Sequence, residues 1–129
     1  MEHNITVGME YTVECTVTKE LSAEAVGSGS LPVYATPYMI ALMEKASEQC
    51  VLGGLAEGFG TVGTVVDIKH IAATPLGMKV TAHAVLKEID KRRLVFDVKV
   101  CDECEEIGHG LHERFIIDTV KFMERVNAK

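Results

Sequence analysis

The sequence predicts an α+β domain in which one long helix packs against an antiparallel sheet. An alternating segment comes first, an apolar segment with helical spacing follows Pro37, and four alternating segments separated by polar turns come after it. Strands joined by short turns pair antiparallel, and an apolar helix must be buried against the sheet that they form. We expect residues 1–129 to make a single domain, because this length suits one hydrophobic core.

The first strand is predicted from Tyr11 to Val17, where apolar and polar residues alternate strictly. Residues 19–35 are less regular, and the glycines, serines and proline between Gly27 and Pro32 predict that part of this segment is loop. Thr36 is a suitable helix N-cap, and Pro37 suits the first helical position. Helical spacing of apolar residues then continues to Val51, and Gly53-Gly54 ends the helix.

Four further strands are predicted over residues 61–71, 78–89, 94–100 and 107–119, and the tail from Val120 is predicted to be a short helix. Polar turns separate the strands at residues 74–77, 90–92 and 102–106. Strict alternation in the first of these strands would place Val62, Val66, Ile68 and His70 on one face.

Composition excludes several classes of protein. The net charge is -6 and no basic stripe is present, which argues against nucleic-acid binding. No apolar run approaches the length that spans a membrane, and the N-terminus has no secretory signal, so we expect a cytoplasmic protein. The four cysteines are then expected to be reduced thiols, at Cys15, Cys50, Cys101 and Cys104.

Three side chains are candidates for chemistry. Burial of His70 beside apolar residues would favour a neutral imidazole that accepts a proton, although the residue pattern alone favours a core histidine with one hydrogen bond. Glu44 borders the apolar stripe of the helix, where it is either a solvated carboxylate or a general base or nucleophile. Thr36 is explained by helix capping alone, but a hydroxyl there also suits orientation of a carboxylate or carbonyl group.

Two cysteines and two histidines near the C-terminus form an alternative zinc site, with Cys101, Cys104, His109 and His112 as ligands. Only four residues separate Cys104 from His109, whereas zinc fingers use about twelve. We therefore expect no metal. The sequence also has no phosphate-binding glycine loop, no Gly-x-Ser-x-Gly elbow and no His-Glu-x-x-His helix.

Several segments together resemble the hot-dog-fold thioesterases of the fluoroacetyl-CoA thioesterase type: YATPYM at 34–39, Glu44, Gly63-Thr64, HIAATPLG at 70–77 and EIGHGLHER at 106–114. The resemblance implies an acyl-CoA substrate, with CoA as part of the substrate and no separate cofactor. It implies edge-to-edge pairing into a homodimer, with further pairing into a tetramer left open. It also implies catalysis by Thr36, Glu44 and His70, and an acyl pocket formed with Gly63 and Arg114.

The sequence departs from the fluoroacetyl-CoA enzyme in the segment before the helix. That enzyme has an aromatic lid here, whereas Gly27-Ser28-Gly29-Ser30-Leu31-Pro32 contains no aromatic residue. We therefore expect a more open pocket and a different short acyl group. Two alternatives remain: a hydratase or dehydratase of acyl thioesters on the same fold, and a non-catalytic acyl-CoA-binding protein.

Overall fold

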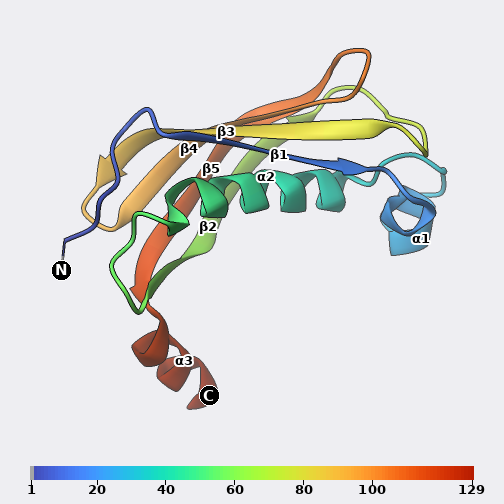
Figure 1. Ribbon diagram of the computed structural model, residues 1–129. Helices are drawn as coiled ribbons and strands as arrows, with labels where there is room; N and C mark the ends of the chain where they lie inside the picture. Colours follow the sequence, from blue (N-terminus) through green and yellow to red (C-terminus); the bar gives the residue numbers. More distant parts are fainter. Residues whose placement is uncertain (1) are drawn as a thin grey trace.

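A computed structural model describes residues 2–129 of the chain, which form one sheet, one long helix and several short helices (Figure 1). The strands are β1 (Glu10–Thr16), β2 (Phe59–His70), β3 (Lys79–Asp90), β4 (Arg93–Cys101) and β5 (Glu106–Asp118). The helices are the 3₁₀ helix η1 (Lys19–Leu21), α1 (Ala23–Val26), α2 (Thr36–Leu52) and α3 (Thr119–Asn127).

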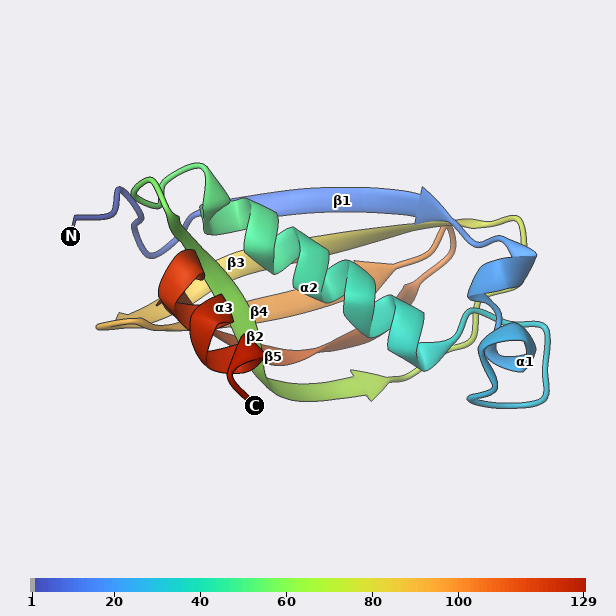
Figure 2. The same cartoon turned by 90° about the horizontal axis from the view of Figure 1, so that it is seen from below.

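The five strands form one antiparallel sheet in the order β1-β3-β4-β5-β2. Strands β3, β4 and β5 follow one another through tight hairpins, with Lys91 in the left-handed conformation at the first turn. The 12-residue strand β2 pairs with β5 on the side of β5 away from β4. It therefore forms one edge of the sheet (Figure 2). Its outer side therefore presents backbone N–H and C=O groups that no described strand pairs with.

Helix α2 lies across one face of the sheet, as the apolar spacing predicts (Figure 2). Its buried side chains pack chiefly on β3 and β1, over a core whose fully buried strand residues include Leu86, Phe96 and Ile107. Burying each such side chain contributes about 1.5–3 kcal/mol, so this contact accounts for much of the fold's stability. The helical residues in the core are Met39, Leu42, Met43, Ala46, Cys50 and Val51.

The predicted role of Thr36 as N-cap is wrong. Ala35 is the N-cap residue, in extended conformation and without a side-chain cap, and Thr36 begins the helix itself. The Thr36 hydroxyl instead contacts His70, which lies 34 residues away in the sequence. The Thr36 hydroxyl therefore bonds to a residue distant in the sequence and does not cap its own helix.

The segment before α2 is more structured than its composition predicts. The Ser22 hydroxyl accepts a hydrogen bond from the N–H of Ala25 at the start of α1, and Gly27 ends this helix in the left-handed conformation. Isolated bridges then join Ser22 to Tyr34 and Val33 to Pro75. The segment is thereby held over the end of the sheet where α2 begins (Figure 1).

Strand β2 contains a β-bulge that the strict alternation does not predict. The register with β5 shifts between Gly63 and Val65, so Val62 pairs with Phe115 but Val66 pairs with His112. An extra residue reverses the faces on its two sides. Val66, Ile68 and His70 therefore share a face, whereas the prediction that Val62 shares it is wrong.

No helix among residues 2–129 is long and apolar enough to cross a membrane.

Candidate active site

The N-terminus of α2 and the C-terminus of β2 meet at the pair of Thr36 and His70. The Thr36 Oγ1 atom lies 2.7 Å from the His70 Nδ1 atom, which is a short hydrogen bond. These are two of the three residues predicted to be catalytic, and the structure brings them together. The contact fixes the plane of the imidazole, because the ring is held through one nitrogen.

The second ring nitrogen of His70, Nε2, is buried and has no hydrogen-bond partner among residues 2–129. Burial lowers the pKa of His70, and the backbone of Ala72 offsets this only in part. The imidazole is therefore neutral at pH 7. A buried polar atom without a partner costs free energy, so it indicates a place where a bound group completes the hydrogen bonding.

An open cleft of about 350 Å³ lies beside this pair. It is lined by Thr36, His70, residues 71–73 and members of the segment before α2, among them Ala23 and Ser28. Val33, Tyr34 and Ile71 complete the lining. No aromatic residue from the segment 27–32 enters the cleft, in agreement with the sequence of that segment.

A second cluster forms around Glu44, two turns further along α2. Its Oε2 atom lies 3.8 Å from Nη1 of Arg114, a buried cation on β5. A Cβ atom at Gly63 would lie 3.0 Å from the same carboxylate oxygen, so the glycine allows the carboxylate to approach the strand. The Glu44 side chain is 41% exposed, which leaves it accessible to a substrate or water.

Arg114 is held by two residues that the sequence analysis did not assign to the site. Its Nε donates to Thr61 Oγ1 at 2.7 Å, and its Nη2 donates to the Thr61 carbonyl oxygen at 3.0 Å. Its Nη1 lies 3.2 Å from Nε2 of His112. Burial lowers the pKa of Arg114, while Glu48 and Glu44 raise it; a guanidinium nevertheless remains charged in proteins.

Within one chain, the predicted site residues form two groups. Thr36 and His70 make one, whereas Glu44, Gly63 and Arg114 make the other. Thr36 and Glu44 are eight residues apart on α2, which places their backbones about 12 Å apart along the helix axis. In the described chain, residues 2–129, no hydrogen bond or ion pair joins the two groups.

The four residues of the alternative zinc site do not converge. His112 points to the interior and bonds to the Val65 carbonyl, whereas His109 is half-exposed and contacts Glu106. The two histidines are three residues apart in a strand, so they point to opposite faces. Across residues 2–129, no three histidine, cysteine, aspartate or glutamate side chains are grouped as metal ligands.

Solved structures resemble this chain along nearly its whole length. A fluoroacetyl-CoA thioesterase superposes with a TM-score of 0.91 at 34% identity, over 97% of each chain. A variant of a fluoroacetyl-CoA-specific thioesterase with bound fluoroacetate and CoA gives 0.87 at 34%, over 92% of this chain and 99% of that one. A thioesterase superfamily member from Thermus thermophilus gives 0.85 at 30%, over 97% and 98%. The fold is thus that of the hot-dog thioesterases, as predicted.

Sequence comparison narrows this class to one family. Residues 17–120 match the family of fluoroacetyl-CoA-specific thioesterases. The fluoroacetyl-CoA thioesterase of Streptantibioticus cattleyicolor is 36% identical over 135 aligned positions, which cover 100% of this chain and 97% of the relative. The chain belongs to the fluoroacetyl-CoA-specific thioesterase family, and it is an acyl-CoA thioesterase, an enzyme that hydrolyses a thioester bond. The predicted family and enzyme class are confirmed.

Proposed function

We propose that this enzyme hydrolyses a short acyl-CoA to a carboxylic acid and free CoA at a site shared by two subunits. The observation that carries the proposal is the separation of the predicted catalytic residues into two groups along β2. Each group is chemically incomplete: one has an imidazole with an unused nitrogen, and the other has a carboxylate beside a buried cation. Completion requires a second copy of the chain.

The free edge of β2 supplies the surface for that second copy. The strand is long, and the apolar side chains of Val65 and Val66 are 41% and 46% exposed. Such an edge favours pairing with another strand. Antiparallel pairing of two β2 strands along this edge would bring the His70 end of one strand alongside the Gly63 end of its partner. Paired strands lie about 4.8 Å apart, so His70 then lies close to the partner's Glu44.

Each site would then combine Thr36 and His70 of one subunit with Glu44, Gly63 and Arg114 of its partner. Glu44 attacks the acyl carbon or activates the water that does so. If Glu44 attacks, the carbon–sulfur bond breaks to release the thiolate, water then hydrolyses the acyl–Glu44 anhydride to the carboxylic acid, and His70 takes a proton from that water and passes it to the thiolate. If Glu44 activates water, the water adds to the acyl carbon, the carbon–sulfur bond breaks, and His70 passes the proton of the water to the thiolate. Thr36 orients the imidazole through its hydrogen bond.

The substrate we propose carries a short acyl group other than fluoroacetyl. The cleft beside His70 is open, and segment 27–32 contains no aromatic residue to cover it. Its lining includes small residues such as Ala23 and Ala73 together with Val33, Tyr34 and Ile71. CoA enters as part of the substrate, and the reaction needs no further cofactor. We place the enzyme in the cytoplasm, which agrees with four free cysteines within residues 2–129.

A panel of acyl-CoA esters, with release of free thiol as the readout, tests this function. We expect the wild type to turn over at least one short acyl-CoA. Glu44→Gln and His70→Asn should each lose activity by about a hundredfold or more, because each removes a group that acts in the transition state. The control Glu57→Gln changes an exposed carboxylate in the loop after α2 and should remain active.

Three results would contradict the proposal. Equal rates for wild type, Glu44→Gln and His70→Asn would remove the site assignment. Loss of enoyl-CoA absorbance without thiol release would identify a hydratase instead. Saturable binding of acyl-CoA esters without any turnover would identify a binding protein.

A further inference from the structure

The position of Arg114 depends on a histidine whose protonation pattern is set by a backbone carbonyl. The Nδ1 atom of His112 lies 2.8 Å from the carbonyl oxygen of Val65. A carbonyl oxygen only accepts, so Nδ1 carries the proton of this hydrogen bond. In the neutral ring Nε2 then has a free lone pair, and Nη1 of Arg114 donates to it at 3.2 Å.

The neutral state of His112 follows from its surroundings. The residue is 1% exposed. Burial lowers its pKa, and the charge of Arg114 lowers it further, while the Val65 carbonyl, Glu44 and Glu113 act in the opposite direction. Phe96 stacks near the ring at 6.4 Å between centroids and adds no charge. A neutral imidazole is the form that accepts from a guanidinium, since an imidazolium has no lone pair to offer.

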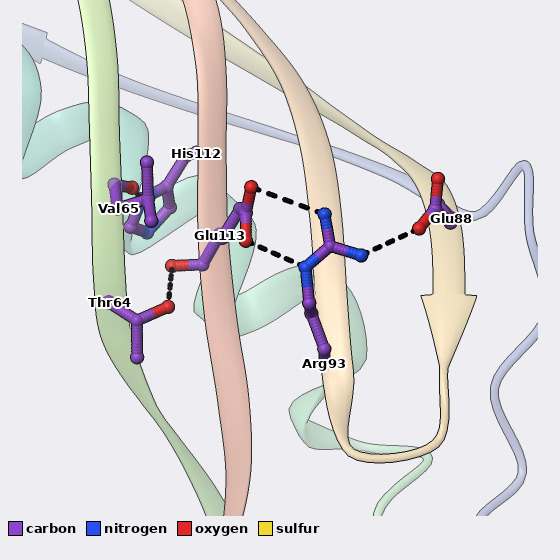
Figure 3. A network of polar contacts seen from close by, with 6 residues as sticks. All are labelled: Thr64, Val65, Glu88, Arg93, His112 and Glu113. Carbon is purple, nitrogen blue, oxygen red and sulfur yellow. Dashed lines mark hydrogen bonds and ion pairs between the residues drawn. The ribbon is translucent and has the colours of Figure 1, made fainter.

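The β-bulge of β2 provides the carbonyl that orients His112. The register shift between Gly63 and Val65 releases the Val65 carbonyl from the regular pairing pattern. The hydroxyl of Thr64, inside the bulge, donates to the Glu113 carbonyl at 3.2 Å (Figure 3). Side chains of the two strands therefore complete hydrogen bonds that the bulge leaves open.

We propose that His112 is a positioning residue that holds the Arg114 guanidinium in the orientation facing Glu44. Thr61 binds one edge of the guanidinium through Nε and Nη2, and His112 accepts from Nη1, the atom nearest the Glu44 carboxylate. Without this acceptor, a buried N–H of Arg114 lacks a partner, and the guanidinium rotates towards another acceptor. The role in catalysis rests on the proposed function of Glu44.

Two substitutions of His112 each remove one of the two hydrogen bonds of its ring and keep the other. His112→Gln places an amide oxygen near the position of Nε2, so it keeps the acceptor for Arg114 and loses the donor to Val65. His112→Asn places an amide nitrogen near the position of Nδ1, so it keeps the donor to Val65 and loses the acceptor. Each removes one buried hydrogen bond, and similar losses of stability are expected for both.

The activities of the two variants should differ although their stabilities do not. We expect kcat/KM to fall about threefold in His112→Gln and about 30-fold to 100-fold in His112→Asn, because small displacements in a catalytic site have effects of this size. His109→Asn, on the exposed face of the same strand, is the control and should match the wild type. Equal losses in the Gln and Asn variants would show that His112 acts only through folding.

A readout independent of turnover distinguishes failure of this inference from failure of the proposed function. The Arg114 Nε–H signal in ¹⁵N NMR spectra, assigned with Arg114→Lys, should exchange slowly with solvent in the wild type and in His112→Gln. It should exchange faster in His112→Asn. Unchanged exchange in His112→Asn would overturn the positioning role, whether or not Glu44 is required for hydrolysis.

Discussion

The hydroxyl of Thr36 lies 2.7 Å from Nδ1 of His70 although 34 residues separate them in the chain. The contact joins the first residue of α2 to the last residue of β2. It leaves Nε2 as the nitrogen of His70 that is free to meet a ligand. The Thr36 hydroxyl therefore contributes to the orientation of the imidazole.

Removing that hydroxyl should impair the enzyme without unfolding it. Thr36→Val keeps the shape of the side chain, and Thr36→Ser keeps the hydroxyl. We expect kcat to fall about tenfold to a hundredfold in Thr36→Val, because the imidazole loses its fixed plane. Steady-state hydrolysis of the best acyl-CoA in the panel measures this. Thr36→Ser should stay close to the wild type because it keeps the hydroxyl, and a Thr36→Val enzyme as active as the wild type would contradict the role of that group.

Adding a methyl group at Gly63 should disturb the Glu44 cluster. The new Cβ atom would lie 3.0 Å from Glu44 Oε2 and 3.3 Å from Cε1 of His112, so the flexible carboxylate must move away. We expect Gly63→Ala to fold and to lose about tenfold or more in kcat/KM. Gly60→Ala lies on the same strand and meets only Thr119 at 3.3 Å, so it controls for the loss of a strand glycine. Equal activity of the two variants would contradict the role of Gly63.

Mixing two inactive variants tests whether the site is shared. In a heterodimer of Glu44→Gln and His70→Asn, one shared site receives both substitutions and the other receives neither. Random exchange of subunits makes about half of the dimers mixed, so about a quarter of wild-type activity should return. Thiol release before and after refolding the mixture together measures this. A site contained within one chain would give no recovery.

Stability should decrease as the solution becomes acidic. Burial lowers the pKa values of both His70 and His112. In the unfolded chain these residues titrate near pH 6.5, so between that value and the lowered pKa values the unfolded state binds more protons. The free energy of unfolding therefore falls as the pH falls through this window, and it is unaffected by these residues at higher pH.

Urea unfolding at pH 7.5 and pH 5.5 measures that dependence. The loss of stability at pH 5.5 should be smaller in His112→Gln than in the wild type, because one titrating group has been removed. An identical pH dependence in His112→Gln and the wild type would contradict the neutral state of His112.

Much of the fold follows from local sequence patterns. The buried face of α2 and the four strands after it have the predicted periodicity, because each pattern repeats with the geometry of its own element. The predictions for Thr36 and Val62 are wrong because contacts between segments distant in the sequence decide the structure there. The Thr36 hydroxyl bonds to His70 and not to its own helix, and the bulge after Gly63 turns Val62 to the other face.

The candidate site was less predictable than the fold. The resemblance pointed to Thr36, Glu44 and His70, but only the structure shows that they form two groups in one chain. Spacing along the sequence does not reveal which strands become neighbours, so Thr61 was not found. His112 and Arg114 are two residues apart in a strand and share a face, which is a signal that the sequence does contain.

The polar contacts on the outer face of the sheet also bear on the site. Arg93 on β4 contacts Glu113 on β5 at 2.8 Å and Glu88 on β3 at 2.7 Å (Figure 3). Glu113 stands between His112 and Arg114 in sequence and points to the opposite side. Slippage of β5 by one residue would exchange these sides, bringing the negative charge of Glu113 into the interior towards Glu44. Repulsion between the Glu113 and Glu44 carboxylates therefore disfavours this shift of β5.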